Sequence, residues 1–110
     1  MRADNGDIPP SEQVFLLQEL QNLLEKQIEL ANQGNIKDVE SLSKQASSLV
    51  EKCLQSRILE QTDLKNQREK LQKLYEQLSL ALSAQRTETS EQLSRIRKGI
   101  KTLHVYRGGI

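Results

Sequence analysis

Leucines and other apolar residues recur every three or four positions along most of this chain, with polar residues between them. Such spacing places the apolar side chains on one face of an α-helix. Between Gly34 and Gly99 the sequence has neither glycine nor proline, so no helix breaker interrupts this stretch. The pattern therefore predicts an all-α fold of long amphipathic helices that pack lengthwise.

The first helix is predicted over residues 11–33, after an arm of residues 1–10 that we expect to be disordered. Gly34 can adopt the left-handed conformation that ends a helix, and Asn35 is a good N-cap for the next one. Because this connection is short, we expect the second helix to be an antiparallel neighbour of the first. The apolar sector of the first helix is wide and contains two rows: Leu17, Leu20, Leu24, Ile28 and Ala31, and Leu16, Leu23 and Leu30.

The second helix is predicted over residues 36–60, where Val39, Leu42, Ala46, Leu49 and Cys53 repeat at spacings of three and four. Thr62 and Asp63 offer a cap before the next leucine series, so we predict a break there; one continuous helix is the alternative. The third helix is predicted over residues 63–106. A polar patch from Ser83 to Gln92 interrupts its apolar stripe, and Thr89 with Gln92 fits a capping box, so a turn near residues 87–90 is a second alternative.

These elements predict one domain, an antiparallel three-helix bundle or coiled-coil hairpin with a long C-terminal helix and a tail of residues 107–110. At ~1.5 Å per residue the third helix would span over about 60 Å, so we expect its C-terminal third to project beyond its shorter neighbours. We find no internal repeat.

Composition argues against an enzyme. The chain of 110 residues has one histidine and one cysteine, and no cysteine pair or glycine-rich phosphate loop. We expect no catalytic residue, metal or cofactor, and we expect Cys53 to be a small buried apolar residue. The net charge is only +1, but no acidic residue follows Glu91, while five basic ones do: Arg95, Arg97, Lys98, Lys101 and Arg107. The chain also lacks an apolar signal region or membrane span, so a cytoplasmic location is expected.

The candidate binding site is the apolar stripe near the C-terminus, which consists of Leu93, Ile96, Ile100, Leu103 and Tyr106. The stripe could dock an amphipathic helix of a protein client. Alternatively, the first helix folds over it or it closes a homodimer. Gly99 lies within the stripe, which suggests either flexibility or a close approach of another segment to the backbone.

The stretch from Leu30 to Leu42, with its Gly34-Asn35-Ile36 step between two amphipathic helices, resembles the FlgN-type chaperones of flagellar and type III export. The resemblance covers residues 13–106 and implies a cytoplasmic chaperone that binds C-terminal helical segments of hook–filament junction proteins or other secreted clients. It also implies client binding by Leu93, Ile96, Ile100 and Leu103, and contact of Tyr106 with an export-gate protein. The main alternative is a coiled-coil dimerisation or adaptor module. A basic RNA-binding helix is a third and weaker hypothesis, because interleaved aromatic residues are lacking.

Overall fold

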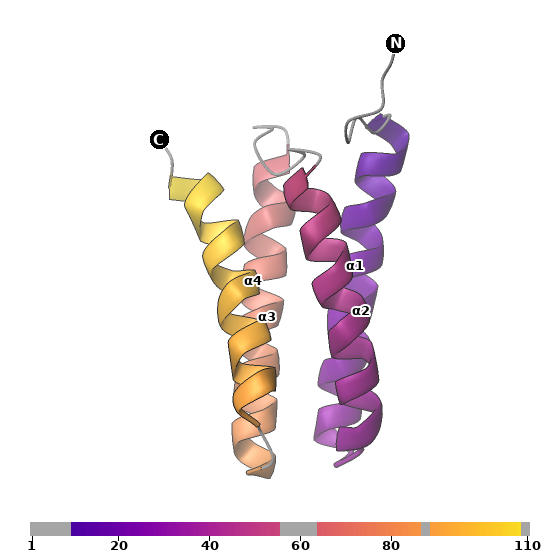
Figure 1. Ribbon diagram of the computed structural model, residues 1–110, viewed down its shortest axis with the longest axis vertical. Helices are drawn as coiled ribbons and strands as arrows, with labels where there is room; N and C mark the ends of the chain where they lie inside the picture. Colours follow the sequence, from indigo (N-terminus) through magenta and orange to yellow (C-terminus); the bar gives the residue numbers. More distant parts are fainter. Residues whose placement is uncertain (1–9, 56–63, 87–88, 109–110) are drawn as a thin grey trace.

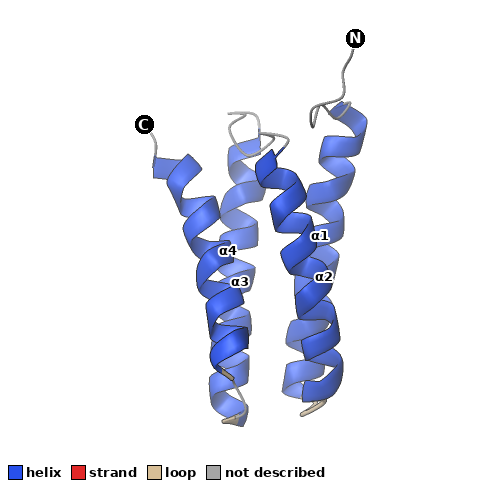
Figure 2. Cartoon of the chain, viewed as in Figure 1, coloured by secondary structure: helices blue, strands red, loops and turns tan. Residues whose placement is uncertain are grey.

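The structure is a computed structural model that describes the backbone of residues 10–55, 64–86 and 89–108 and the side chains of residues 14–55, 64–86 and 89–103. It contains α1 (Pro10–Asn32), α2 (Ile36–Gln55), α3 (Lys65–Gln85) and α4 (Ser90–Gly108). The described residues form no strand, so the all-α prediction is confirmed (Figure 2). The predicted end of the second helix and the break at Thr62 and Asp63 lie outside the described residues.

Consecutive helices run in opposite directions along the long axis of the molecule (Figure 1). Both α2 and α3 pack against α1, and α4 packs against α3 along much of its length and against α2 at fewer positions. The molecule measures 48 × 27 × 21 Å. It therefore consists of two helical hairpins, α1–α2 and α3–α4, that lie side by side with α1 against α3 and α2 against α4.

The first hairpin turns at Gly34, as the sequence predicts. Gly34 has a φ of 80°, in the left-handed region. Its N–H donates to the carbonyl of Ala31 at 3.0 Å, and the N–H of Asn35 donates to the carbonyl of Leu30 at 2.9 Å. This pair of hydrogen bonds is a Schellman motif, which satisfies carbonyls that the end of α1 would otherwise leave unpaired.

The prediction of one long third helix over residues 63–106 is wrong, and so is the helix count of three. α3 ends at Gln85 because Arg86 takes a left-handed conformation with a φ of 56°, and its N–H donates back to the carbonyls of Leu82 and Ser83. α4 then begins with a capping box. The N–H of Gln92 donates to Oγ1 of Thr89 at 3.1 Å, and the N–H of Thr89 donates to Oε1 of Gln92 at 3.0 Å. The chain therefore reverses direction between the end of α3 and the start of α4, within the polar patch.

The two hairpins carry similar spacings of apolar positions. α1 and α3 share the pattern Leu-Gln-x-Leu-x-x-x-Leu, at residues 17–24 and 71–78. α2 and α4 share apolar positions at spacings of three, four and three, from Val39 to Leu49 and from Leu93 to Leu103.

Leucines dominate the core between the hairpins. The most deeply buried are Leu17, Leu20, Leu24, Leu71, Leu78, Leu82 and Leu103. Leu30 and Ala31 are buried as well, and Leu16, Leu23 and Ile28 pack partly against the cluster, so the apolar sector of α1 is as wide as predicted. Cys53 is 1% exposed, which confirms its predicted role as a small buried residue.

Candidate functional site

The candidate stripe does not project from the molecule. Ile96 is 4% exposed and Leu103 is 2% exposed, and both belong to the core cluster. Ile100 is partly buried against that cluster, and Leu93 is also partly buried. The expected projection is wrong because the turn at Arg86 folds α4 back onto α3 and α2. The side chain of Tyr106 lies outside the described residues, so its predicted contact with an export gate stays a prediction.

Polar side chains join α4 to α2 over the edge of this buried stripe. We call these contacts the polar seam. Within the described residues it comprises Glu40, Ser43 and Glu51 of α2 and Gln92, Arg95 and Lys98 of α4. Arg95 Nη1 donates to Oε2 of Glu40 at 3.0 Å and to Oγ of Ser43 at 3.3 Å. Lys98 Nζ forms an ion pair with Oε2 of Glu51. The acidic partners all come from α2 and the basic ones all come from α4.

Glu40 and Gln92 connect the seam to the turn before α4. Gln92 is 2% exposed, and its Nε2 donates to Oε1 of Glu40 at 3.2 Å. The same side chain caps the start of α4 through Thr89. Both carboxylate oxygens of Glu40 are therefore used, one by Gln92 and one by Arg95. The side-chain amide of Gln92 therefore both caps the start of α4 and attaches α4 to α2.

Gly99 lies where the backbone of α4 meets the ring of Tyr75 on α3. A Cβ atom at this position would lie only 2.4 Å from Cζ of Tyr75, and it would come within 2.8 Å of two other ring atoms. Tyr75 is 4% exposed, so its ring is enclosed and has little room to move aside. Of the two explanations that the sequence allowed for Gly99, the structure supports the close approach, since the glycine lets the backbone of α4 rest on the tyrosine ring.

Burial also shifts the pKa of two ionisable groups in this region. Desolvation raises the pKa of the Cys53 thiol from 9.0 to about 11. Desolvation likewise raises the pKa of the Tyr75 hydroxyl well above its usual range, and the nearby Cys53 adds to this effect. Both groups are neutral at physiological pH. Neither is activated for nucleophilic or acid–base chemistry, which would require a pKa closer to 7.

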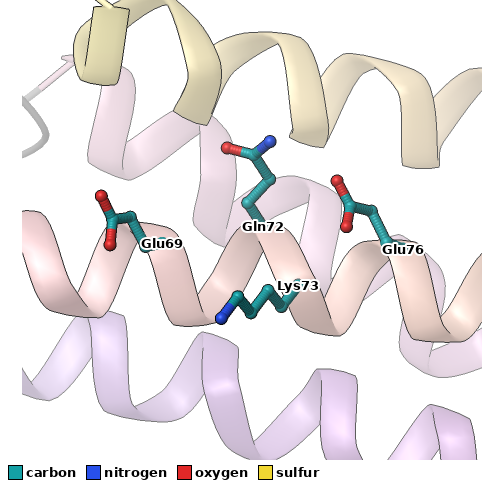
Figure 3. Close-up of a pocket in the computed structure, with 4 residues that line it drawn as sticks. All are labelled: Glu69, Gln72, Lys73 and Glu76. Atoms are coloured by element: carbon teal, nitrogen blue, oxygen red, sulfur yellow. The ribbon is translucent and has the colours of Figure 1, made fainter.

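A groove elsewhere on the surface is lined by one helix. Glu69, Gln72, Lys73 and Glu76 of α3 line it, and Figure 3 shows Gln72 and Glu76 extending on the side where α4 lies. These side chains follow helical spacing, as an ordinary solvated face does. Among the described residues, no group of three or more His, Cys, Asp or Glu side chains could hold a metal ion. No helix in the described part of the chain is long and apolar enough to cross a membrane.

Sequence reasoning identified the apolar stripe but missed the residues that cover it. Glu40 and Glu51 carry no local sign of a role in the sequence, and Arg95 and Lys98 stand out only as parts of the basic segment after Glu91. A signal was present, since the acidic residues flank the apolar face of one helix and the basic residues flank the matching face of another. That signal could be used only after residues 90–103 were placed beside α2 and not beyond it.

The chain was compared with family models, curated proteins and solved structures, and none of them matches it.

Proposed function

We propose that this chain is a cytoplasmic export chaperone that binds an amphipathic helical segment of a secreted client and keeps it unassembled before secretion. The class of function comes from the FlgN-type resemblance, and so do junction proteins of the flagellar hook and filament as clients. One observation supports a binding role: the apolar stripe of α4 is bordered toward α2 by the polar seam.

The strengths of the contacts indicate where the bundle would open. Exposed ion pairs such as Lys98 with Glu51 contribute roughly 0–1 kcal/mol. A fully buried leucine or isoleucine contributes about 1.5–3 kcal/mol. Separating α2 from α4 would break polar contacts that water can replace in part, and it would expose fewer buried apolar side chains, among them Ile96 and Leu103. Separating α1 from α3 would expose several fully buried leucines.

A client would therefore enter between α2 and α4 while each hairpin stays intact. Opening there would uncover Ile96 and Leu103, together with the partly buried Leu93 and Ile100. An amphipathic client helix would cover them in the helix-in-groove mode. The closed bundle would be the resting state, so the affinity for a client would be reduced by the fraction of molecules that are closed.

The alternative is a dimerisation or adaptor module. In that case a second copy, and not a client, would cover the stripe. Light scattering separates these functions, because an adaptor of this kind would be a stable dimer whose mass does not change when secreted proteins are added.

The test is capture of secreted proteins from a lysate of the native cell by the tagged chain and by two variants. Leu93→Glu places a charge on a partly buried position of the stripe outside the deepest core. Leu80→Glu is the matched control, because Leu80 is 71% exposed on α3. We expect wild type and Leu80→Glu to retain a secreted protein through a helical segment and Leu93→Glu to lose it. Thermal unfolding of all three proteins checks that they are folded.

Undiminished capture by Leu93→Glu would remove the stripe from the site. Captured proteins that are not exported would contradict the chaperone role itself.

A further inference from the structure

Basic and acidic residues are divided unevenly between α4 and α2, the helix that borders its apolar stripe. No acidic residue follows Glu91 in the sequence, and Arg95 and Lys98 both reach acidic side chains of α2. Two further basic residues, Arg97 and Lys101, are exposed on α4. The stripe therefore lies on a basic helix, and the segment that covers its edge in the closed bundle supplies carboxylates.

We infer that the segment this chain binds is an amphipathic helix with acidic residues beside its apolar stripe, and that it takes the place of α2 against α4. This inference rests on the proposed function and names the chemistry of the client. In the structure α2 packs against this surface of α4, so its side chains indicate the chemistry that the surface accepts. Its carboxylates, Glu40 and Glu51, are about three helical turns apart and so lie on one side of the helix.

Desolvation makes Arg95 the residue that would discriminate between clients. The side chain of Arg95 is 22% exposed and that of Glu40 is 31% exposed, so this ion pair is shielded from water more than a surface pair is. A client with lysine at the corresponding position would bring like charge against a partly buried guanidinium. A client with an uncharged residue would leave Arg95 without its carboxylate. Both would weaken binding, and the like charge would do so more strongly.

The same surface suits an acidic helix better than RNA. Gln92 and Arg95 use their donors toward α2, over an apolar stripe that a helix can cover. Binding of single-stranded RNA relies on aromatic residues that stack with bases. The described residues of α4 whose side chains are placed, 90–103, contain no aromatic residue.

The experiment uses α2 itself as the probe. Three labelled peptides of residues 36–55 are compared by fluorescence anisotropy: the natural sequence, Glu40→Gln with Glu51→Gln, and Glu40→Lys with Glu51→Lys. Circular dichroism in trifluoroethanol checks that the three peptides are equally helical. The receptors are the full chain and two full-length variants whose own seam is opened by like charge, Glu40→Lys with Glu51→Lys and Arg95→Glu with Lys98→Glu.

We expect the Glu40→Lys, Glu51→Lys protein to bind the natural peptide at least about tenfold more tightly than the lysine peptide, with the glutamine peptide between them. The order should reverse for the Arg95→Glu, Lys98→Glu protein, and the preference should shrink in 1 M salt, where the Debye length is about 3 Å. The unmodified chain should show the same preference at lower affinity, because its own α2 competes.

The other possible results have different consequences for the charge inference and for the proposed function. Equal binding of all three peptides would overturn the charge inference and leave the proposed function standing. A lack of binding to all three receptors would overturn both. An oligouridine of about 20 nucleotides that displaces the natural peptide from the Glu40→Lys, Glu51→Lys protein and binds more tightly than the peptide would assign this surface to RNA and overturn the inference.

Discussion

The side of the bundle where α1 packs differs in chemistry from the side where α2 meets α4. Leu17, Leu20 and Leu24 of α1 are at most 1% exposed, and α1 contacts both α2 and α3 extensively. Between α2 and α4 the contacts are fewer, and they include hydrogen bonds and ion pairs that carboxylates of α2 form with an amide, a guanidinium and an ammonium group of α4. One chain thus combines a side that resists separation with a side that water and salt can weaken.

The difference implies that the hairpins separate at the polar seam before the leucine side comes apart. Cooperative units within a protein open with different free energies, and regions with few buried apolar contacts open first. If the seam opens alone, α4 exchanges between two partners, α2 and a client. If both sides open together, the chain is a two-state bundle and the seam has no special role.

The largest expected effect lies on the leucine side. Leu24→Ala removes a side chain that is 0% exposed, and we expect it to lower the free energy of unfolding by about 3 kcal/mol through lost burial and the cavity left behind. Urea denaturation measures this change. Leu80→Ala is the control, since Leu80 is 71% exposed and its loss should change stability by no more than about 0.5 kcal/mol. Equal effects of the two substitutions would refute the leucine core.

Alkaline pH should loosen the region around Cys53 and Tyr75. The pKa of Cys53 is raised from 9.0 to about 11, so the folded state favours the neutral thiol. Its stabilising effect is complete below pH 9 and is lost as pH rises toward 11, amounting to roughly 3 kcal/mol. Thermal unfolding from pH 7 to pH 11 should show this decline, and Cys53→Ala should flatten part of it. The raised pKa of Tyr75 adds a further loss at still higher pH. An identical pH profile for Cys53→Ala would contradict the proposed contribution of the thiol.

Replacing Gly99 by alanine should lower the stability of the protein, although the same replacement inside a helix usually raises it. Replacing glycine by alanine inside a helix normally stabilises by about 1 kcal/mol. Here the added Cβ would collide with the ring of Tyr75, so we expect Gly99→Ala to destabilise by about 2 kcal/mol. Combining it with Tyr75→Leu should remove most of that penalty, which a double-mutant cycle measures. Additive effects would mean that α4 does not rest on the ring.

The smallest expected effect is the loss of stability on substitution of Glu40, and it distinguishes the polar seam from an exposed ion pair. Glu40→Gln should cost about 1 kcal/mol, because Glu40 accepts hydrogen bonds from both Gln92 and Arg95 at a partly buried place. Glu29→Gln is the matched control. Glu29 pairs with Lys26 on one helix, both side chains are more than half exposed, and the expected change is close to zero. Comparable changes in urea midpoint for the two variants would show that the seam is only surface charge.

The sequence sufficed to predict what short-range rules determine. The helical period, the left-handed Gly34 and the wide apolar sector of α1 are local features, and all three appear as predicted. The sequence offers both the capping box of Thr89 and Gln92 and a continuous leucine stripe, and the structure forms the capping box. It prevails because folding α4 back buries Ile96 and Leu103 in the core, whereas extending α3 would leave both side chains in solvent.

The site was harder to predict because it depends on contacts between residues far apart in the chain. Arg86 gives no local warning of a left-handed conformation, which arginine adopts rarely. Without that turn, Arg95 cannot be placed near Glu40, nor Gly99 near Tyr75. The sequence alone shows that Leu93, Ile96, Ile100 and Leu103 form one apolar face, but the polar residues that border this face are identified only from the fold.

The most direct measurement is the labelling rate of Cys53 by a thiol reagent as a function of urea, in the wild type and in the Arg95→Glu, Lys98→Glu variant. Cys53 is the single cysteine and lies buried on α2, so the reagent reacts only after an opening. If the polar seam opens alone, labelling at low urea will depend on urea much less steeply than global unfolding does, and the variant will label at least about tenfold faster. The single variant Arg95→Glu separates this opening from fraying of the end of α2, because Arg95 contacts the opposite end of that helix, whereas Lys98 pairs with Glu51 close to Cys53. Labelling that follows global unfolding at every urea concentration would contradict an independent opening of the seam.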